Sequence, residues 1–147
     1  MDDNLKTYMA VDTEGKSHLE LLIKVYDGAI KSYRTAEDLI KQEKLTDGRE
    51  ELERAKKFVV HLYTTLDPDK GGEVADNLGK LYSWVICQTM VAEASKDLAV
   101  IDDIVNVLSN LRNGWMELSK QQPKNEPVAA APASDPEAVP AGFTTSA

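Results

Sequence analysis

The stretch from residue 17 to residue 30 decides the fold and reads SHLELLIKVYDGAI. Its apolar residues recur every three or four positions, which is the spacing of an amphipathic helix. Ser17, followed three residues later by Glu20, forms a capping-box pattern that marks the start of a helix. We therefore expect a helix that begins at Ser17 and runs to about Glu43.

The apolar face of this first helix is wider than a surface helix needs. Projected at about 100° per residue, its apolar side chains cover an arc of roughly 200°, whereas an arc of ~100° suffices for a surface helix. Two interpretations follow from this width. Either the helix is buried on more than one side, or part of its surface binds another chain.

Three further helices follow, joined by short connections. The apolar spacing predicts the second helix at about residues 49–66, with one narrow apolar stripe, and the third at about residues 73–96. Asp97 fits the N-cap of the fourth helix, whose apolar residues continue to position 118. Because short connections place neighbouring helices antiparallel, the sequence predicts an all-α fold, an antiparallel four-helix bundle over residues 17–121.

The third helix contains a long uncharged run. Residues 81–92 carry no charged side chain, and their apolar residues point in nearly every direction around the helix. This run is too short to span a bilayer, which takes about 20 residues. The helix is therefore either central in the bundle or forms part of a groove for an apolar helix of another chain.

The two ends of the chain differ from this body. Five of the six prolines lie from position 123 onward, in a stretch rich in Ala, Ser and Thr whose only aromatic residue is Phe143. This stretch has no apolar period, so we expect a disordered Pro/Ala-rich tail over residues 122–147. Residues 1–16 form a separate N-terminal segment, with a turn of helix expected at about residues 5–9.

Composition excludes several classes of function. The chain has 147 residues and a formal net charge of −8, so it lacks the basic surface needed to bind nucleic acid or an anionic membrane. Its single cysteine, Cys87, rules out an intrachain disulfide, and we expect it to be a small buried hydrophobe. The first 30 residues contain no secretory signal, so the expected location is the cytoplasm.

No arrangement of residues recommends an enzyme, a metal site or a cofactor. His18 and His61 lack the Glu-x-x-His spacing of a di-iron bundle, although His61 leaves a histidine phosphotransfer module as an alternative. The stretch DPDKGG at residues 67–72 resembles the start of a calcium loop but fails at loop positions 5 and 12. We interpret Gly71 and Gly72 as an interhelical turn.

Several ordered pieces of the sequence resemble the flagellin-specific export chaperones of the FliS family. The stretch LLIKVYDGAI at residues 21–30 looks like the leucine-rich stretch of that family, which ends in Tyr-Asp-Gly-Ala. Residues 66–82 look like its junction between the second and third helices, and residues 97–115 like its last helix. Tyr8 lies where the family carries an N-terminal tyrosine. The chain departs from the pattern at Ser17, which is followed by His rather than Pro.

This resemblance implies a function without catalysis. Chaperones of this kind bind the disordered C-terminal segment of flagellin in the cytoplasm, prevent its premature polymerisation and help to deliver it to the flagellar type III export gate. The implied fold is an antiparallel four-helix bundle, in which residues 1–16 would cap an apolar surface of the free protein. The free form would be a monomer or a weak dimer.

From this resemblance we derive a hypothesis for the site. Tyr8 and Val11 would act as a plug that leaves when flagellin arrives. At Gly28 we expect a close approach by another helix, from this chain or from a partner. A self-associating structural bundle remains a second alternative. The residues expected to line the client-binding groove are Leu22, Ile23, Tyr26, Gly28, Leu78, Tyr82, Val85 and Ile86.

Overall fold

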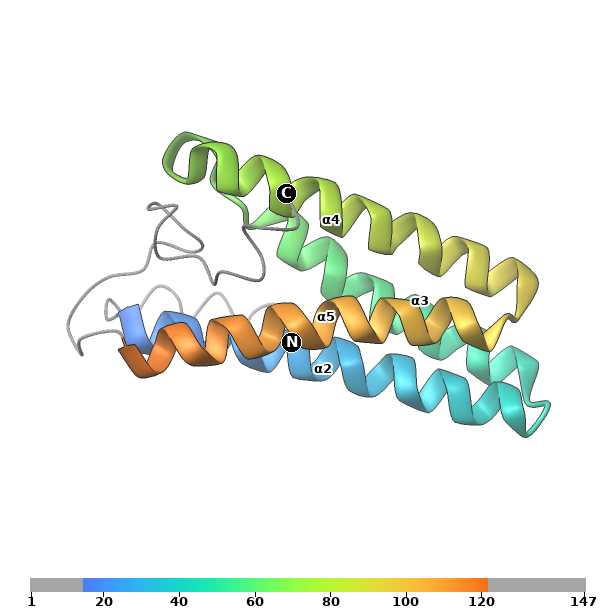
Figure 1. Cartoon of the computed structure of the whole chain (residues 1–147). Coiled ribbons are helices and arrows are strands. Elements are labelled where there is room, and N and C mark those ends of the chain that lie inside the picture. Colours follow the sequence, from blue (N-terminus) through green and yellow to red (C-terminus); the bar gives the residue numbers. More distant parts are fainter. Residues whose placement is uncertain (1–14, 122–147) are drawn as a thin grey trace.

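The computed structural model describes residues 15–121, without the side chains of residues 15–17, 68 and 70. They form four helices: α2 (Gly15–Lys41), α3 (Leu45–Thr64), α4 (Pro68–Ser95) and α5 (Leu98–Gln121) (Figure 1). The predicted all-α antiparallel bundle is confirmed. The plug residues Tyr8 and Val11, the turn at residues 5–9 and the tail at 122–147 lie outside the described residues.

The four helices are arranged as the corners of a square. α2 packs on α3 and α5, α4 packs on the same two helices, and α2 and α4 face each other across the diagonal (Figure 1). Since consecutive helices are antiparallel, α2 and α4 run in the same direction. The contacts of α2 with its two neighbours are more extensive than those of α4.

The connection between α2 and α3 is a Schellman motif. The backbone N–H of Lys44 donates to the Leu39 carbonyl, and that of Glu43 to the Ile40 carbonyl, both at 2.9 Å. Glu43 adopts the left-handed conformation that this motif requires, with φ of 61°. The chain therefore reverses within three residues, and α3 starts at Leu45, earlier than the sequence predicted.

Two predicted helix starts have opposite outcomes. Oδ1 of Asp97 accepts a hydrogen bond from the backbone N–H of Ala99 at 2.9 Å, which confirms Asp97 as the N-cap of α5. In contrast, α2 begins at Gly15. Ser17 thus lies inside the helix, and the prediction that it is the N-cap is wrong.

The start of α4 contains a sharp break. The helix begins at Pro68, and the Gly71 N–H donates to the Asp67 carbonyl at 2.7 Å. Gly72 then leaves the helical conformation, with φ of 55° and ψ of −129°, which glycine adopts at little cost. One helical turn thus precedes the break, and the regular helix starts at Glu73, where the sequence placed it.

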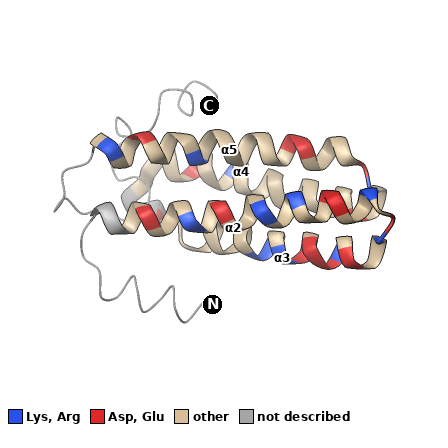
Figure 2. Ribbon diagram, turned by 90° about the horizontal axis from the view of Figure 1, so that it is seen from below, with Lys and Arg blue, Asp and Glu red and all other residues tan. Residues whose placement is uncertain are grey.

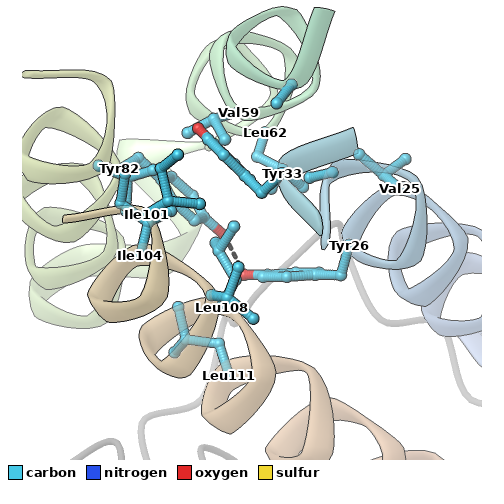
Figure 3. Close-up of a cluster of buried hydrophobic side chains, with 14 of the residues drawn as sticks. Val25, Tyr26, Tyr33, Val59, Leu62, Tyr82, Ile101, Ile104, Leu108 and Leu111 are labelled. Atoms are coloured by element: carbon cyan, nitrogen blue, oxygen red, sulfur yellow. Dashed lines mark hydrogen bonds between the residues drawn. The ribbon is translucent and has the colours of Figure 1, made fainter. Parts of the chain in front are cut away.

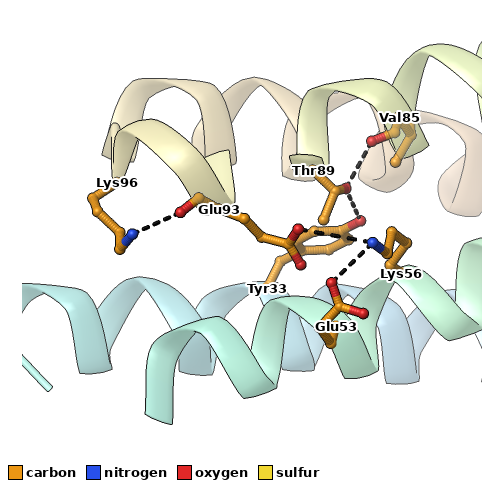
Figure 4. A network of polar contacts seen from close by, with 7 residues as sticks. All are labelled: Tyr33, Glu53, Lys56, Val85, Thr89, Glu93 and Lys96. Carbon is orange, nitrogen blue, oxygen red and sulfur yellow. Dashed lines mark hydrogen bonds and ion pairs between the residues drawn. The ribbon is translucent and has the colours of Figure 1, made fainter. Parts of the chain in front are cut away.

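Two pairs of hydroxyl groups join α2 to α4 across the core. The hydroxyls of Tyr26 and Tyr82 are 2.5 Å apart, and those of Tyr33 and Thr89 are 2.6 Å apart (Figures 3 and 4). Thr89 also donates to the Val85 carbonyl, so Tyr33 is the donor in its pair. Within each helix the two residues are two turns apart, and hence on one face. These pairs therefore fix which face of α4 points inward.

The hydroxyl pairs are enclosed by aliphatic side chains. Tyr26 and Tyr33 are fully buried, and Tyr82 is 2% exposed. Burial raises the pKa of Tyr26 to about 12 and raises the pKa of Tyr82 well above its usual value. The phenols therefore remain neutral. The surrounding core consists mainly of Leu, Ile, Val and Ala.

The prediction that a helix closely approaches Gly28 is confirmed, and the helix is the chain's own α3. A Cβ atom at Gly28 would lie 2.8 Å from Cε1 and Cζ of Phe58. Real Cβ atoms do not make contacts this short, so only glycine leaves room for the ring where it lies.

Removing one hydroxyl of the Tyr26–Tyr82 pair, and then both, should reveal the interaction free energy between the two hydroxyl groups. We expect Tyr26→Phe or Tyr82→Phe alone to cost about 1–3 kcal/mol of unfolding free energy, because each leaves a buried hydroxyl without its partner. The double variant should cost clearly less than the sum. Urea denaturation measures all three, and strictly additive costs would contradict the proposed coupling.

A second double-mutant cycle, between Gly28 and Phe58, tests the close contact at Gly28. In a Phe58→Ala background, Gly28→Ala should stabilise the protein by about 1 kcal/mol, because alanine is the better helix former. With Phe58 present, the new methyl group meets the ring, so the gain should vanish or reverse. Thermal unfolding of the four proteins measures the difference, and an equal effect in both backgrounds would refute the close approach.

Candidate functional site

The eight residues predicted to line a groove divide into two sets. Five lie in the core of the described bundle, exposed by 6% or less: Ile23, Tyr26, Leu78, Tyr82 and Val85. Three are partly exposed: Leu22, Gly28 and Ile86. The buried five offer no surface to another chain in this conformation. Whether any of the eight contacts a client stays a prediction.

The wide apolar arc of α2 is explained by packing. This helix is covered by α3 on one side and α5 on the other, and its two core tyrosines reach α4. Its apolar residues are therefore used inside the bundle. The interpretation that the helix is buried on more than one side holds for α2.

The apolar residues of α4 are not all used in this way. Trp84 and Met90 are exposed by 38% and 54%, and Val91 and Cys87 are also exposed. These four residues lie on the side of the helix opposite to the core-facing residues. The stripe they form has no charged neighbour within residues 81–92. The expectation that Cys87 is buried is wrong, because its position in the helix turns it toward solvent.

The neighbouring helix α3 extends this stripe. Val60 and Tyr63 are exposed on α3, and a Cβ atom at Gly79 of α4 would lie 3.7 Å from Cε1 of Tyr63. Further along, Lys56 of α3 and Glu93 of α4 form an ion pair. Val60 lies on α3 between these two contacts. We call the set the outer apolar face: Val60, Tyr63, Trp84, Cys87, Met90 and Val91.

A charged cluster closes the seam between α3 and α4 at one end of the outer apolar face. Nζ of Lys56 lies 2.9 Å from Oε2 of Glu53 and 3.7 Å from Oε1 of Glu93 (Figure 4). Burial and the adjacent Glu53 raise the pKa of Glu93, while the pKa of Glu53 is lowered by Glu93 and Lys56. The cluster marks where the apolar surface between α3 and α4 ends.

The side of the bundle formed by α2 and α5 has a different character. Arg34 of α2 pairs with Asp102 of α5 at 3.0 Å, and Arg112 of α5 pairs with Asp27 of α2 at 2.8 Å. Charged residues of both signs are distributed along α2 and α3 in this view (Figure 2). The exposed large apolar residues of the described chain, in contrast, lie on α3 and α4.

The described residues contain no arrangement that suggests chemistry. Within residues 15–121, no group of three or more His, Cys, Asp or Glu side chains could hold a metal ion. His18 and His61 are each partly buried, on different helices. None of the described helices is long and apolar enough to cross a membrane. What the described bundle does present is an exposed apolar surface on α3 and α4.

Comparison with known proteins identifies the family. The family model described as "Flagellar protein FliS" matches residues 1–122. The chain is 29% identical over 120 residues to the flagellar secretion chaperone FliS of Salmonella typhimurium, covering 78% of this chain and 89% of that protein. It is 24% identical over 119 residues to the flagellar secretion chaperone FliSB of Pseudomonas aeruginosa, covering 78% and 94% respectively.

A solved structure agrees with these relatives. It is described as a crystal structure of a flagellar chaperone from bacteria, and it matches with a TM-score of 0.67 at 30% sequence identity. The match covers 71% of this chain and 85% of the other. The chain therefore belongs to the FliS family, the family of flagellar secretion chaperones.

Proposed function

We propose that this chaperone binds the C-terminal segment of flagellin in the cytoplasm, through its outer apolar face. Binding there would keep flagellin from polymerising before export by the flagellar type III apparatus. The observation that carries the proposal is the uncharged, exposed stripe of α4, on a bundle whose core is already filled. Exposed apolar surface of this kind marks interaction sites.

The shape of the surface suggests how the segment binds. A helix that lays an apolar stripe into a groove contacts its partner every three or four residues, which is also the spacing of Trp84, Cys87 and Val91. A segment that folds on binding typically buries about 1,000–3,000 Å². The α4 stripe supplies only part of that area. The segment would therefore continue over Val60 and Tyr63 of α3.

Two finer parts of the proposal concern other contacts of the chaperone. Tyr8 and Val11 are the residues we propose as a plug in the free protein, on the strength of the family resemblance. A component of the flagellar export gate is the partner we propose for the loaded complex. The family relationship supports binding to flagellar proteins in general.

A charge placed on the outer apolar face should impair client binding selectively. We expect Met90→Glu to weaken the affinity for a peptide of the flagellin C-terminal segment by about tenfold or more, because the carboxylate must lose its hydration. Leu45→Glu is the matched control, since Leu45 is 44% exposed at the turn between α2 and α3. It should leave the affinity unchanged. Isothermal titration calorimetry measures both.

Two results would count against the proposal. Equal affinities for Met90→Glu and the unmodified protein would show that the client binds elsewhere. A stable complex with flagellin that lacks its C-terminal segment would show that the segment is not what the chaperone recognises. Circular dichroism of each variant establishes that the bundle is intact before binding is compared.

A further inference from the structure

The C-terminal tail of the chain has no role in the proposed binding of flagellin. The family match ends at residue 122, so the Pro/Ala-rich tail is an addition to the family pattern. Its last stretch, residues 138–147, reads AVPAGFTTSA and carries no charged side chain. Phe143 is the only aromatic residue beyond the bundle's last helix. An uncharged stretch with a single aromatic residue has the chemistry of an apolar anchor.

We propose that residues 138–147 lie on the outer apolar face when no client is bound, with Phe143 as the anchor. The tail then acts as a tethered competitor of the client. The competitor role rests on the proposed function, whereas the contact between the tail and the outer apolar face does not.

The place where the tail leaves the bundle makes this contact possible. Because α4 and α5 are antiparallel, α5 ends at Gln121, at the end of the bundle where α4 begins (Figure 1). Measured along the α4 axis from Glu73 at ~1.5 Å per residue, Trp84 lies at about 17 Å and Val91 at about 27 Å. The 22 residues that lead to Phe143 span up to about 70 Å when extended. The anchor therefore reaches every part of the stripe.

The chemistry of the two surfaces matches. Neither residues 138–147 nor residues 81–92 contain a charged side chain, so contact between them leaves no ion without its hydration. The ring of Phe143 would meet an aromatic ring at Trp84 and a thioether at Met90, and both are favourable neighbours for an aromatic side chain.

A second copy of the chain fits this face less well. Stable dimers bury about 800 Å² on each partner, and a stripe of three or so helical turns provides much less. A segment on the same chain, in contrast, is present at an effective concentration of about millimolar. Tethering therefore lets a small contact area suffice.

The reactivity of Cys87 can report whether the outer apolar face is covered. Cys87 is the only cysteine of the chain, and the described bundle leaves it exposed in the middle of the stripe. The rate at which a maleimide alkylates Cys87 in the full chain therefore measures how much of the time the face is covered. No client is needed for this measurement.

The test compares two substitutions at one position. Phe143→Ser should raise the alkylation rate of Cys87 by about two- to fivefold, as expected when a tethered contact is lost. Phe143→Leu keeps an apolar anchor and should stay near the rate of the unmodified chain. Equal rates for Phe143→Ser and the unmodified chain overturn the inference. A rate that rises on dilution of the unmodified chain also overturns it, because a second copy is then the occupant.

Client binding separates this inference from the proposed function. Phe143→Ser should bind the flagellin peptide more tightly, by the same factor as its gain in alkylation rate. If alkylation increases while the affinity stays the same, the tail covers the face but the client binds elsewhere, and the competitor role is wrong. If neither changes while Met90→Glu weakens client binding, the tail inference fails and the proposed function stands.

Discussion

The hydrogen bond between the hydroxyls of Tyr26 and Tyr82 is the interaction on which the arrangement of α4 depends. Together with the Tyr33–Thr89 pair two turns further along, it joins two helices that face each other across the core. Turning α4 about its axis would leave the buried hydroxyls of Tyr26 and Tyr33 without these partners, at a cost of about 1–3 kcal/mol for each one. The opposite side of α4, which carries no charged side chain over residues 81–92, therefore faces solvent. The surface available for function follows from polar pairing in the core.

The same constraint explains why two helices of similar composition have different roles. α2 and α4 both carry more apolar residues than a surface helix needs. α2 contacts its two neighbours extensively, so its apolar residues are buried. α4 is less extensively packed and keeps Trp84 and Met90 in contact with solvent. Excess apolar composition thus indicates a central helix in one case and an exposed apolar surface in the other. The packing of each helix decides which.

Much of the fold could be predicted from the sequence, because its signals are local. Apolar periodicity located the four helices, Asp97 marked a cap, and the cost of a glycine inside a helix pointed to the close contact at Gly28. The N-cap at Ser17 was predicted wrongly, since helix formation continues back to Gly15. The outward direction of Cys87 and its neighbours could not be predicted. A run that is uncharged on all sides has no amphipathic signal, and only the long-range pairing of the tyrosines shows which side is inside.

The hydroxyl pairing exposes the outer apolar face, and this face is the surface that we propose the flagellin segment covers. Methyl NMR of the methionines tests it directly. Met90 lies on the face, while Met116 on α5 is partly buried away from it. On titration with the flagellin peptide, we expect the Met90 methyl signal, assigned with Met90→Leu, to shift to a new position while that of Met116 stays in place. If the peptide binds and the Met90 signal does not move, the flagellin segment does not cover the outer apolar face.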